Sequence, residues 1–374
     1  MQHGRSFSAA LFSAVVAIVF GLLVGYLLLL IAHSEWAFRD LSTILTAGFG
    51  DTAKFARVLC QAVPLICTGL SFAFAFKTGL FNLGAAGQYA VGAFFALFAG
   101  IHLQLPWYWA VIASIIGGAI WGAIPGICKA LFNVSEIVSS FLFSWIGVFA
   151  VNMAFQNFPM LIVNYWDKSS VTDRTPLLAD ANASAVLPKL GLDRLLNSNL
   201  INIGFLIAVL AAVILWILLQ KTTFGYTIKA CGYSRDASRY SGINVRRTII
   251  RSFMISGALA GLGGGLCYLG GGEQYTFLNV LPAAGFIGIP VALLASSHPI
   301  GIIVSALFIS GIQIGGEALQ PLLISGTTDL IIGVMIYVSA FALPLQILFG
   351  KLFLRRSPAT QSLPDSQGED GENE

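Results

Sequence analysis

Long apolar runs recur along this sequence and limit its fold more than any other feature does. Three of the longest occupy residues 8–32, 201–219 and 330–350. A helix needs about 20 consecutive apolar residues to cross a bilayer. Helices suit such segments because lipid offers the backbone no hydrogen-bond partners. Only 10% of the residues are charged, against about 25% in a typical soluble domain. The sequence therefore predicts an all-α integral membrane protein that crosses the membrane several times.

We expect about ten transmembrane helices. The first run is retained as a helix, because its apolar part exceeds the roughly 7–15 residues of a signal-peptide core. The run at 283–297 is short, which predicts a broken or re-entrant segment. The expected spans are 8–32, 57–76, 88–104, 107–130, 136–158, 199–220, 252–271, 283–297, 299–319 and 326–350.

The distribution of Lys and Arg predicts the orientation. With the N-terminus inside, thirteen of these residues fall on inside segments and seven on outside segments. Positive charges accumulate on the cytoplasmic side, so both termini are predicted to lie inside. A polytopic transmembrane domain then covers residues 1–356, with 159–198 as an external loop and 221–251 as a cytoplasmic loop. The acidic tail, residues 357–374, is predicted to be disordered.

Several chemical signatures are absent from the sequence. It contains no GxxxxGK[ST], HExxH or GxSxG motif and no CxxC pair, so neither a P-loop for ATP nor a metal or catalytic centre is indicated. We expect no cofactor on this chain. The net charge of +3 is too small to suggest nucleic acid. Few carboxylates fall within the expected spans, which weakens an ion-coupled carrier without excluding it.

Glycines recur at the spacing that lets helices approach closely. Gly257, Gly261 and Gly265 form a GxxxGxxxG series, and the pairs Gly122/Gly126 and Gly311/Gly315 have the same spacing. This spacing favours close packing within one bundle over a dedicated dimer face. Residues 87–100 and 285–301 each follow a Gly/Ala-rich break, and transporters often contain internal repeats. A repeat and its absence remain equally open.

The loop at 221–251 indicates a docking surface. It holds seven Lys or Arg residues against one acid, Asp236. Orientation alone accounts for the basic residues. It does not account for Phe224, Tyr226, Tyr233, Tyr240 and Ile243, because apolar side chains on such a loop favour contact with a soluble partner. Ser234 is suited to cap a short helix at 234–241.

Five stretches together resemble the permease subunits of bacterial ABC importers of the ribose/branched-chain type, and most closely the nucleoside importers that use basic-membrane-protein lipoproteins. The stretches are PLICTGLSFAFAFKTGLFNLGAAGQ (64–88), NVSEIVSSFLFSWI (133–146), TTFGYTIKACGYSRDASRYSGIN (222–244), SGALAGLGG (256–264) and GFIGIPVALLASSHPIGI (285–302). The sequence departs from the family at Ala86, where an acidic residue is common. It departs again at FLFSWIG, where a longer amide-containing stretch is common.

The resemblance implies a multi-pass subunit of the bacterial cytoplasmic membrane with several partners. These are a second permease in a heterodimer, a cytoplasmic ATPase that uses ATP and Mg, and an external solute-binding lipoprotein facing 159–198. The 222–244 segment would contain the coupling helix. The residues expected to contact the ATPase are Gly225, Arg235, Asp236, Ala237, Tyr240, Gly242 and Ile243.

A translocation path needs polar groups held within the bilayer. Asn82 and Gln88 flank the break in FKTGLFNLGAAGQ, and Asn152 and Gln156 share a helix face, so these four are expected to line the path. Trp145 could stack on a base, although core packing is the commoner role of such aromatic residues. Sugars and branched-chain amino acids stay open as solutes. A self-sufficient ion-coupled carrier or channel stays open as a different class, and a membrane scaffold or enzyme is disfavoured.

Overall fold

The computed structural model describes residues 2–162, 172–277, 279–319, 325–339 and 341. The predicted tail at 357–374 lies outside these residues, as does the end of the last expected span. The long helices are α1 (Gln2–Ala32), α3 (Thr52–Lys77), α5 (Trp107–Phe132), α6 (Glu136–Asn157), α9 (Gly204–Lys221), α12 (Val245–Leu269) and α14 (Pro299–Glu317). The shorter ones are α2 (Ala37–Thr46), α4 (Ala85–Leu97), α10 (Thr223–Tyr233), α11 (Arg235–Tyr240), α13 (Ala283–Leu294) and α15 (Ser325–Ser339).

The chain is a helical multi-pass membrane protein. Seven described helices are long and apolar enough to cross a membrane, namely α3, α4 with its π-helical extension η1 (Phe98–His102), α5, α6, α9, α12 and α14. Shorter apolar helices at Val15–Ile31, Ala283–Leu294 and Asp329–Val338 fall within the three other expected spans. The all-α membrane class is confirmed, whereas the count of ten spans and the inside location of both termini stay predictions.

Helix α12 extends two helical turns beyond the start of the expected span 252–271. We expected a span to begin at residue 252, but α12 begins at Val245. The Asn244 side chain accepts a hydrogen bond from the Arg247 backbone N–H at 3.0 Å and so caps the helix there. A hydropathy profile misses these turns because they contain two charged residues, Arg246 and Arg247, which are exposed. The loop at 221–251 is consequently helical over much of its length, with α10 and α11 inside it.

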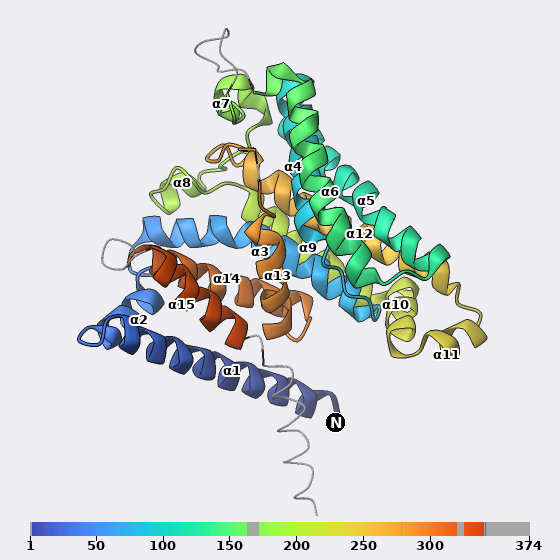
Figure 1. Cartoon of the computed structure of the whole chain (residues 1–374), viewed down its shortest axis with the longest axis horizontal. Helices are drawn as coiled ribbons and strands as arrows, with labels where there is room; N and C mark the ends of the chain where they lie inside the picture. The colour runs from blue at the N-terminus through green and yellow to red at the C-terminus, as the bar shows by residue number, and fades with distance from the viewer. Residues whose placement is uncertain (1, 163–171, 278, 320–324, 340, 342–374) are drawn as a thin grey trace, which may run out of the picture.

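Helix α12 packs against α3, α4 and α5, and glycines bring it close to α5 (Figure 1). A Cβ atom added to Gly257 would lie 2.9 Å from Gly122 Cα, and one added to Gly261 would lie 2.8 Å from Gly118 Cα. Cβ atoms do not approach backbone so closely, so these positions require glycine. The predicted close packing within one bundle is confirmed.

Two of the shorter helices, α4 and α13, begin beside each other. A Cβ atom on Gly285 would overlap the backbone of Ala86. Both helices follow the Gly/Ala-rich breaks seen in the sequence, but their contact does not decide whether the halves are repeats.

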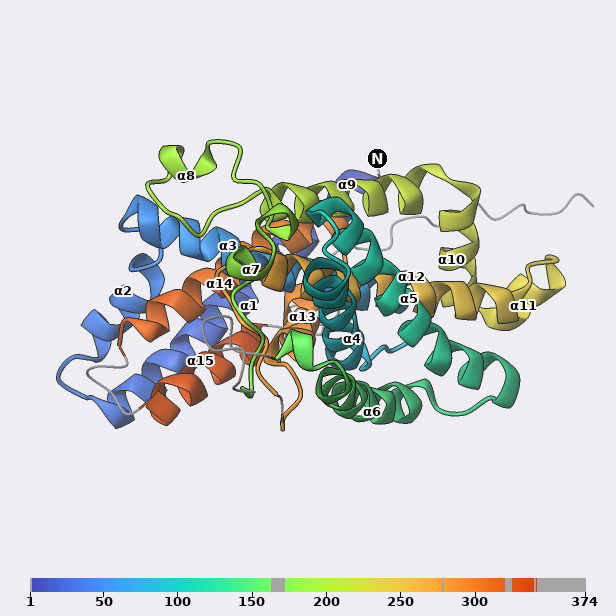
Figure 2. The same cartoon turned by 90° about the horizontal axis from the view of Figure 1, so that it is seen from above.

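The two ends of the bundle carry different elements. Helices α10 and α11 lie at one end of the long axis, and α2 and α8 (Leu192–Leu195) lie at the other (Figures 1 and 2). The described part of the 159–198 loop also contains η2 (Pro159–Leu161), α7 (Leu178–Ala181) and η3 (Ala183–Ala185). It is tied to the chain after α12, because Thr175 N–H donates to Tyr275 O at 2.8 Å.

Candidate functional site

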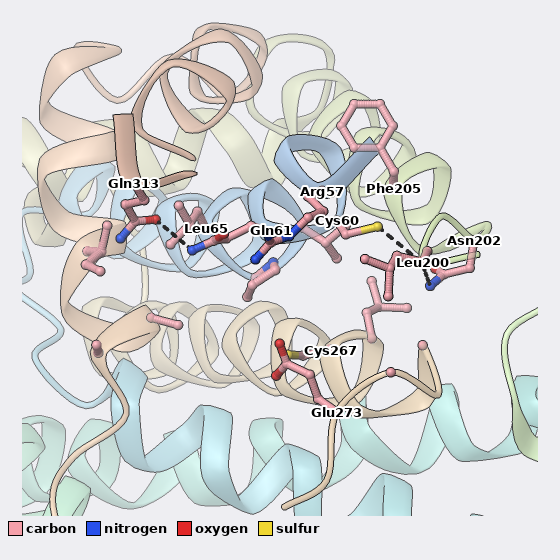
Figure 3. Close-up of a pocket in the computed structure, with 18 of the residues that line it drawn as sticks. Arg57, Cys60, Gln61, Leu65, Leu200, Asn202, Phe205, Cys267, Glu273 and Gln313 are labelled. Atoms are coloured by element: carbon pink, nitrogen blue, oxygen red, sulfur yellow. Dashed lines mark hydrogen bonds between the residues drawn. The ribbon is translucent and has the colours of Figure 1, made fainter. Parts of the chain in front are cut away.

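A cavity of about 440 Å³ lies between α3, α12, α13, α14 and the segment that enters α9 (Figure 3). Its volume falls within the about 300–1,000 Å³ of sites that enclose small molecules. Its walls come from the first turns of α3, the end of α12, the start of α13 and the end of α14. The cavity therefore joins parts of the chain that are far apart in sequence.

Two polar pairs join α3 to α14 at this cavity. The Gln61 side-chain amide donates to the Gln313 side-chain oxygen at 3.4 Å (Figure 3). The Arg57 guanidinium lies 2.9 Å from the Glu317 carboxylate. The Arg57 and Glu317 side chains are 50% and 39% exposed, so solvent weakens this ion pair. The cavity thus offers amide and charged groups that remain accessible to a solute.

A second cavity of about 380 Å³ adjoins the first. Gln61, Gln313 and Glu317 belong to the walls of both. The second cavity extends to α15, where Asp329 and Tyr337 line it. Gln61 and Gln313 therefore lie between the two cavities.

The facing wall of the first cavity carries a thiol and a carboxylate. Cys267 Sγ donates to Glu273 Oε2 at 3.4 Å, and both residues lie across from Cys60 and Gln61 (Figure 3). Within the described part of the chain, no group of three or more His, Cys, Asp or Glu residues could hold a metal ion. This wall therefore adds polar groups but no metal centre.

A buried polar cluster lies deeper in the bundle, where α3, α4 and α12 meet. We call Ser71, Asn82, Gln88 and Ser256 the polar knot. The Asn82 side-chain N–H donates to Gln88 Oε1 at 2.9 Å and to Ser256 Oγ at 2.7 Å. Ser256 Oγ in turn donates to Ser71 O at 2.8 Å. Both amides are fully buried, and they bond to each other and to the knot.

The register of α3 places the polar knot below the cavity. Ser71 follows Gln61 by ten residues, which is about 15 Å along a helix. Lys77, at the end of α3, is a further six residues on, or about 9 Å. Along α3, the knot therefore separates the cavity from the end that carries α10 and α11.

The other expected path residues lie on α6, away from these groups. Gln156 is exposed and Asn152 is half-buried. The Trp145 ring stacks on Phe149 with centroids 5.8 Å apart, and Phe149 is itself exposed. The structure thus brings Asn82 and Gln88 together but places Asn152, Gln156 and Trp145 elsewhere. None of the five lines either of the two adjoining cavities.

The elements α10 and α11 touch the loop that leads into the polar knot. The Arg235 guanidinium donates to Gly79 O at 3.0 Å and lies 3.8 Å from Glu136, whose carboxylate is 2.8 Å from Lys129 Nζ. A Cβ atom on Gly79 would lie 3.3 Å from Gly232 Cα. Any displacement of α10 or α11 therefore acts directly on the chain between α3 and α4.

The residues expected to contact an ATPase differ in exposure. Asp236, Ala237, Tyr240 and Gly242 are exposed, and Tyr240 is 92% so. Arg235 and Ile243 are half-buried. Gly225 is buried, because α10 packs it against the backbone of Leu219. The exposed members form a surface at the end of the bundle that a partner could reach.

Sequence reasoning missed Gln61 and Gln313, which stand at the centre of the cavity. Each is a single amide within an apolar run, and a lone amide in such a run was the sequence signal that could have identified them. Their pairing across 252 positions depends on how α3 and α14 pack.

Residues 54–340 match the model of the family described as branched-chain amino acid transport system / permease component. The guanosine ABC transporter permease protein NupP of Bacillus subtilis (strain 168) is 33% identical over 349 residues, covering 90% of this chain and 95% of that protein. The nucleoside ABC transporter permease protein NupB of Lactococcus lactis subsp. cremoris (strain MG1363) is 36% identical over 315 residues, covering 81% and 83%. A second B. subtilis guanosine permease, NupQ, is 31% identical over 260 residues, covering 67% and 77%.

A multi-pass helical bundle with a polar cavity between its helices is the architecture of a transport permease. The chain belongs to the branched-chain amino acid transport system / permease component family. The resemblance to ABC importer permeases, and to the nucleoside group among them, is confirmed.

Proposed function

We propose that this chain is the transmembrane permease subunit of an ABC importer and forms half of the path for a nucleoside or a related small solute. The names of NupP and NupB, which refer to guanosine and nucleosides, support this choice of solute. ATP and Mg are bound and used by a separate ATPase subunit, and an external binding protein delivers the solute. The protein works in the bacterial cytoplasmic membrane.

The observation that carries the proposal is a polar cavity that a buried polar knot separates from the opposite end of the bundle. The cavity offers hydrogen-bonding amides, and its Arg57 and Glu317 side chains pair with each other. Such a site binds weakly, and conduction requires binding weak enough for release. In this view Gln61 and Gln313 contact the passing solute, and the knot of Asn82 and Gln88 closes the path beyond them.

The same proposal orients the molecule. The cavity and the 159–198 loop face outside, toward the binding protein, and α10 and α11 face the cytoplasm. This orientation follows the positive-inside rule, because the basic residues of 221–251 lie around α10 and α11. Both termini are then cytoplasmic, and Lys77 marks the inner end of α3.

We infer that α11 and the adjoining turn form the coupling segment. A partner that moves Arg235 acts on Gly79 O through their 3.0 Å hydrogen bond. Gly79 lies three residues before Asn82, so the displacement reaches the polar knot through a short stretch of backbone. This route connects ATPase docking to closure of the path through one hydrogen bond and three residues of backbone.

A second permease completes the path. B. subtilis supplies two guanosine permeases among the relatives, NupP and NupQ, and this pairing supports a heterodimer. The second half of the lining would come from that partner.

Reconstitution in liposomes tests the proposal. Liposomes that contain the chain, its partner permease and the ATPase should take up radiolabelled nucleoside only under two conditions. ATP must be present on the side of the membrane that carries the ATPase, and the binding protein must be present on the opposite side. Uptake by the chain alone, driven by a proton or sodium gradient, would establish the secondary-carrier alternative instead. Uptake of a sugar or a branched-chain amino acid in place of the nucleoside would keep the importer and change its solute.

A further inference from the structure

A third pocket, of about 230 Å³, lies at the end of the bundle that carries α10 and α11. The ends of α3 and α9, the second half of α10 and the start of α14 enclose it. It shares no lining residue with the two cavities described above. The pocket is smaller than the about 300–1,000 Å³ of sites for whole small molecules, so it suits a compact group. Its lining residues are Phe76, Lys77, Leu219, Gln220, Lys229, Gly232, Tyr233, Ser297, His298 and Pro299.

The pocket gathers the positive charges of two lysines. Lys77, Lys229 and His298 line it, and among the residues that the structure describes no acidic side chain does. Lys229 Nζ donates to Gln220 Oε1 at 3.2 Å, whereas Lys77 Nζ has no ion-pair or hydrogen-bond partner among the described residues. Burial, and then the charge of Lys77, lower the pKa of His298. The His298 Nδ1 atom accepts a hydrogen bond from Gly301 N–H at 3.4 Å, so this imidazole is neutral and the positive charge of the pocket comes from the two lysines.

The pocket also contains an unpartnered hydroxyl. Ser297 is 1% exposed, and its Oγ atom has no hydrogen-bond partner among the described residues. Its backbone holds a positive φ of 55°, and its N–H donates to Ala292 O at 2.7 Å. A buried hydroxyl normally has a partner. The N-terminus of α14, which follows at Pro299, adds a partial positive charge.

We propose that this pocket binds the phosphate group of an anionic ligand, either an anionic phospholipid or free phosphate. A phosphate group presents several acceptor oxygens on a compact anion, so it can meet both ammonium groups and the Ser297 hydroxyl together. Phe76, which is 38% exposed, and Leu219 supply an apolar wall beside the charged groups. That wall suits the glycerol and acyl portion of a lipid, and basic pockets between membrane helices bind anionic headgroups.

Occupancy of the pocket would tie α3 to α10. Lys77 ends α3 and Lys229 lies on α10, so one phosphate between them joins the two helices. The backbones already touch there, because a Cβ atom on Gly232 would overlap Lys77 O. The ligand would neutralise the repulsion between the two lysines and hold α10 against the loop that leads to the polar knot. This inference does not depend on the solute carried.

Lipid and phosphate binding to the purified full chain tests the proposal. Native mass spectrometry measures binding of phosphatidylglycerol and of phosphatidylcholine after delipidation, and isothermal titration measures inorganic phosphate. The variant Lys77→Gln/Lys229→Gln should lower affinity for phosphatidylglycerol or for inorganic phosphate about 25-fold, at about fivefold for each lysine. Ser297→Ala removes the hydroxyl with little change in volume and should also weaken binding. Lys221→Gln is the matched control, since Lys221 is exposed at the same end and does not line the pocket.

Phosphatidylglycerol and inorganic phosphate, as the two phosphate probes, distinguish the two sources of phosphate, and phosphatidylcholine is the zwitterionic comparison. Selective binding of phosphatidylglycerol that the double variant loses would identify a lipid. Binding of inorganic phosphate with the same loss would identify the free anion. The proposal is overturned if neither probe binds, or if Lys221→Gln weakens binding as much as the double variant does. It is also overturned if a synthetic peptide of residues 357–374 binds through these lysines while neither phosphate probe does, because the ligand would then be a carboxylate.

Discussion

Replacing Asn82 by alanine should destabilise the protein strongly, because the polar knot depends on this side chain. Asn82 is fully buried and accepts a hydrogen bond from Gly84 N–H at 2.8 Å. It also exchanges two hydrogen bonds with the Gln88 amide, at 2.9 and 3.4 Å. Asn82→Ala leaves Gly84 N–H and the Gln88 amide buried without a partner, whereas Ser256 keeps its bond to Ser71 O. At about 1–3 kcal/mol for each unsatisfied group, the free energy of unfolding should fall by about 2–6 kcal/mol.

Equilibrium unfolding of the purified protein in mixed micelles, followed by circular dichroism, measures this loss. Ser256→Ala removes one hydroxyl partner of Asn82 and should have a smaller effect. Asn157→Ala, at the exposed end of α6, should stay within about 0.5 kcal/mol of the original protein. Solute uptake should fall in Asn82→Ala even where enough protein inserts and assembles. If Asn82→Ala unfolds like Asn157→Ala, the polar knot is not a structural closure and the reasoning fails.

Three further outcomes are expected. Gln61→Ala should reduce nucleoside uptake several-fold with normal assembly, while Gln156→Ala on the exposed face of α6 should not; the reverse result in transport assays would move the path to α6. Arg235→Glu removes the bond to Gly79 O and brings a second negative charge near Glu136, so co-purification of the ATPase should drop, as it should in Gly242→Asp. Arg194→Glu at the far end serves as the control, and equal ATPase recovery in all three variants would contradict the coupling role. Because the native pKa of His298 is below its unfolded value of 6.5, the unfolded chain takes up the proton first, and stability should decline as the pH falls below about 6.5. His298→Gln should flatten that part of the pH profile of the melting temperature, and an unchanged slope would assign it to other groups.

The features that the sequence predicted depend on local composition. Apolar runs identified the membrane class, because the length needed to cross a bilayer is fixed. Ser234 was expected to cap a short helix, and its Oγ accepts from Ala237 N–H at 3.3 Å. Glycine spacing predicted the contact of α12 with other helices of the bundle. Each of these inferences needs only residues within one or two helical turns.

The cavity could not be predicted in the same way. Its two polar pairs join residues that are 252 and 260 positions apart, so they exist only once α3 packs against α14. Asn82 and Gln88 were recognised because both flank one break, yet their mutual hydrogen bonds and full burial became visible only in the structure. The early start of α12 was missed because its arginine-rich first turns have no apolar signature.

Helix α12 contacts α5 along one interface and α3 along another, and we call these interfaces its two seams. They differ in a way that indicates which one opens during transport. Glycines hold α12 against α5 backbone to backbone, so movement there meets steric resistance. Against α3, α12 adds exchangeable side-chain hydrogen bonds, namely the 2.9 Å contact of Ser71 Oγ with Ser256 Oγ and the 2.7 Å contact of Thr78 Oγ1 with Ser252 Oγ. We therefore expect the α3–α12 seam to part when solute passes the polar knot.

A cysteine pair across this seam tests that expectation. The hydroxyls of Ser71 and Ser256 are close enough for Ser71→Cys/Ser256→Cys to form a disulfide, which needs about 2.05 Å between sulfurs. The native thiol at Cys67 lies one turn away on α3, so the pair belongs in a Cys67→Ala background. Oxidation, verified by mass spectrometry of the linked peptides, should stop uptake, and reduction should restore it in the same preparation. The single variant Ser71→Cys should respond to neither treatment. Full uptake by the cross-linked protein would show that α3 and α12 move together and that the path opens along another seam.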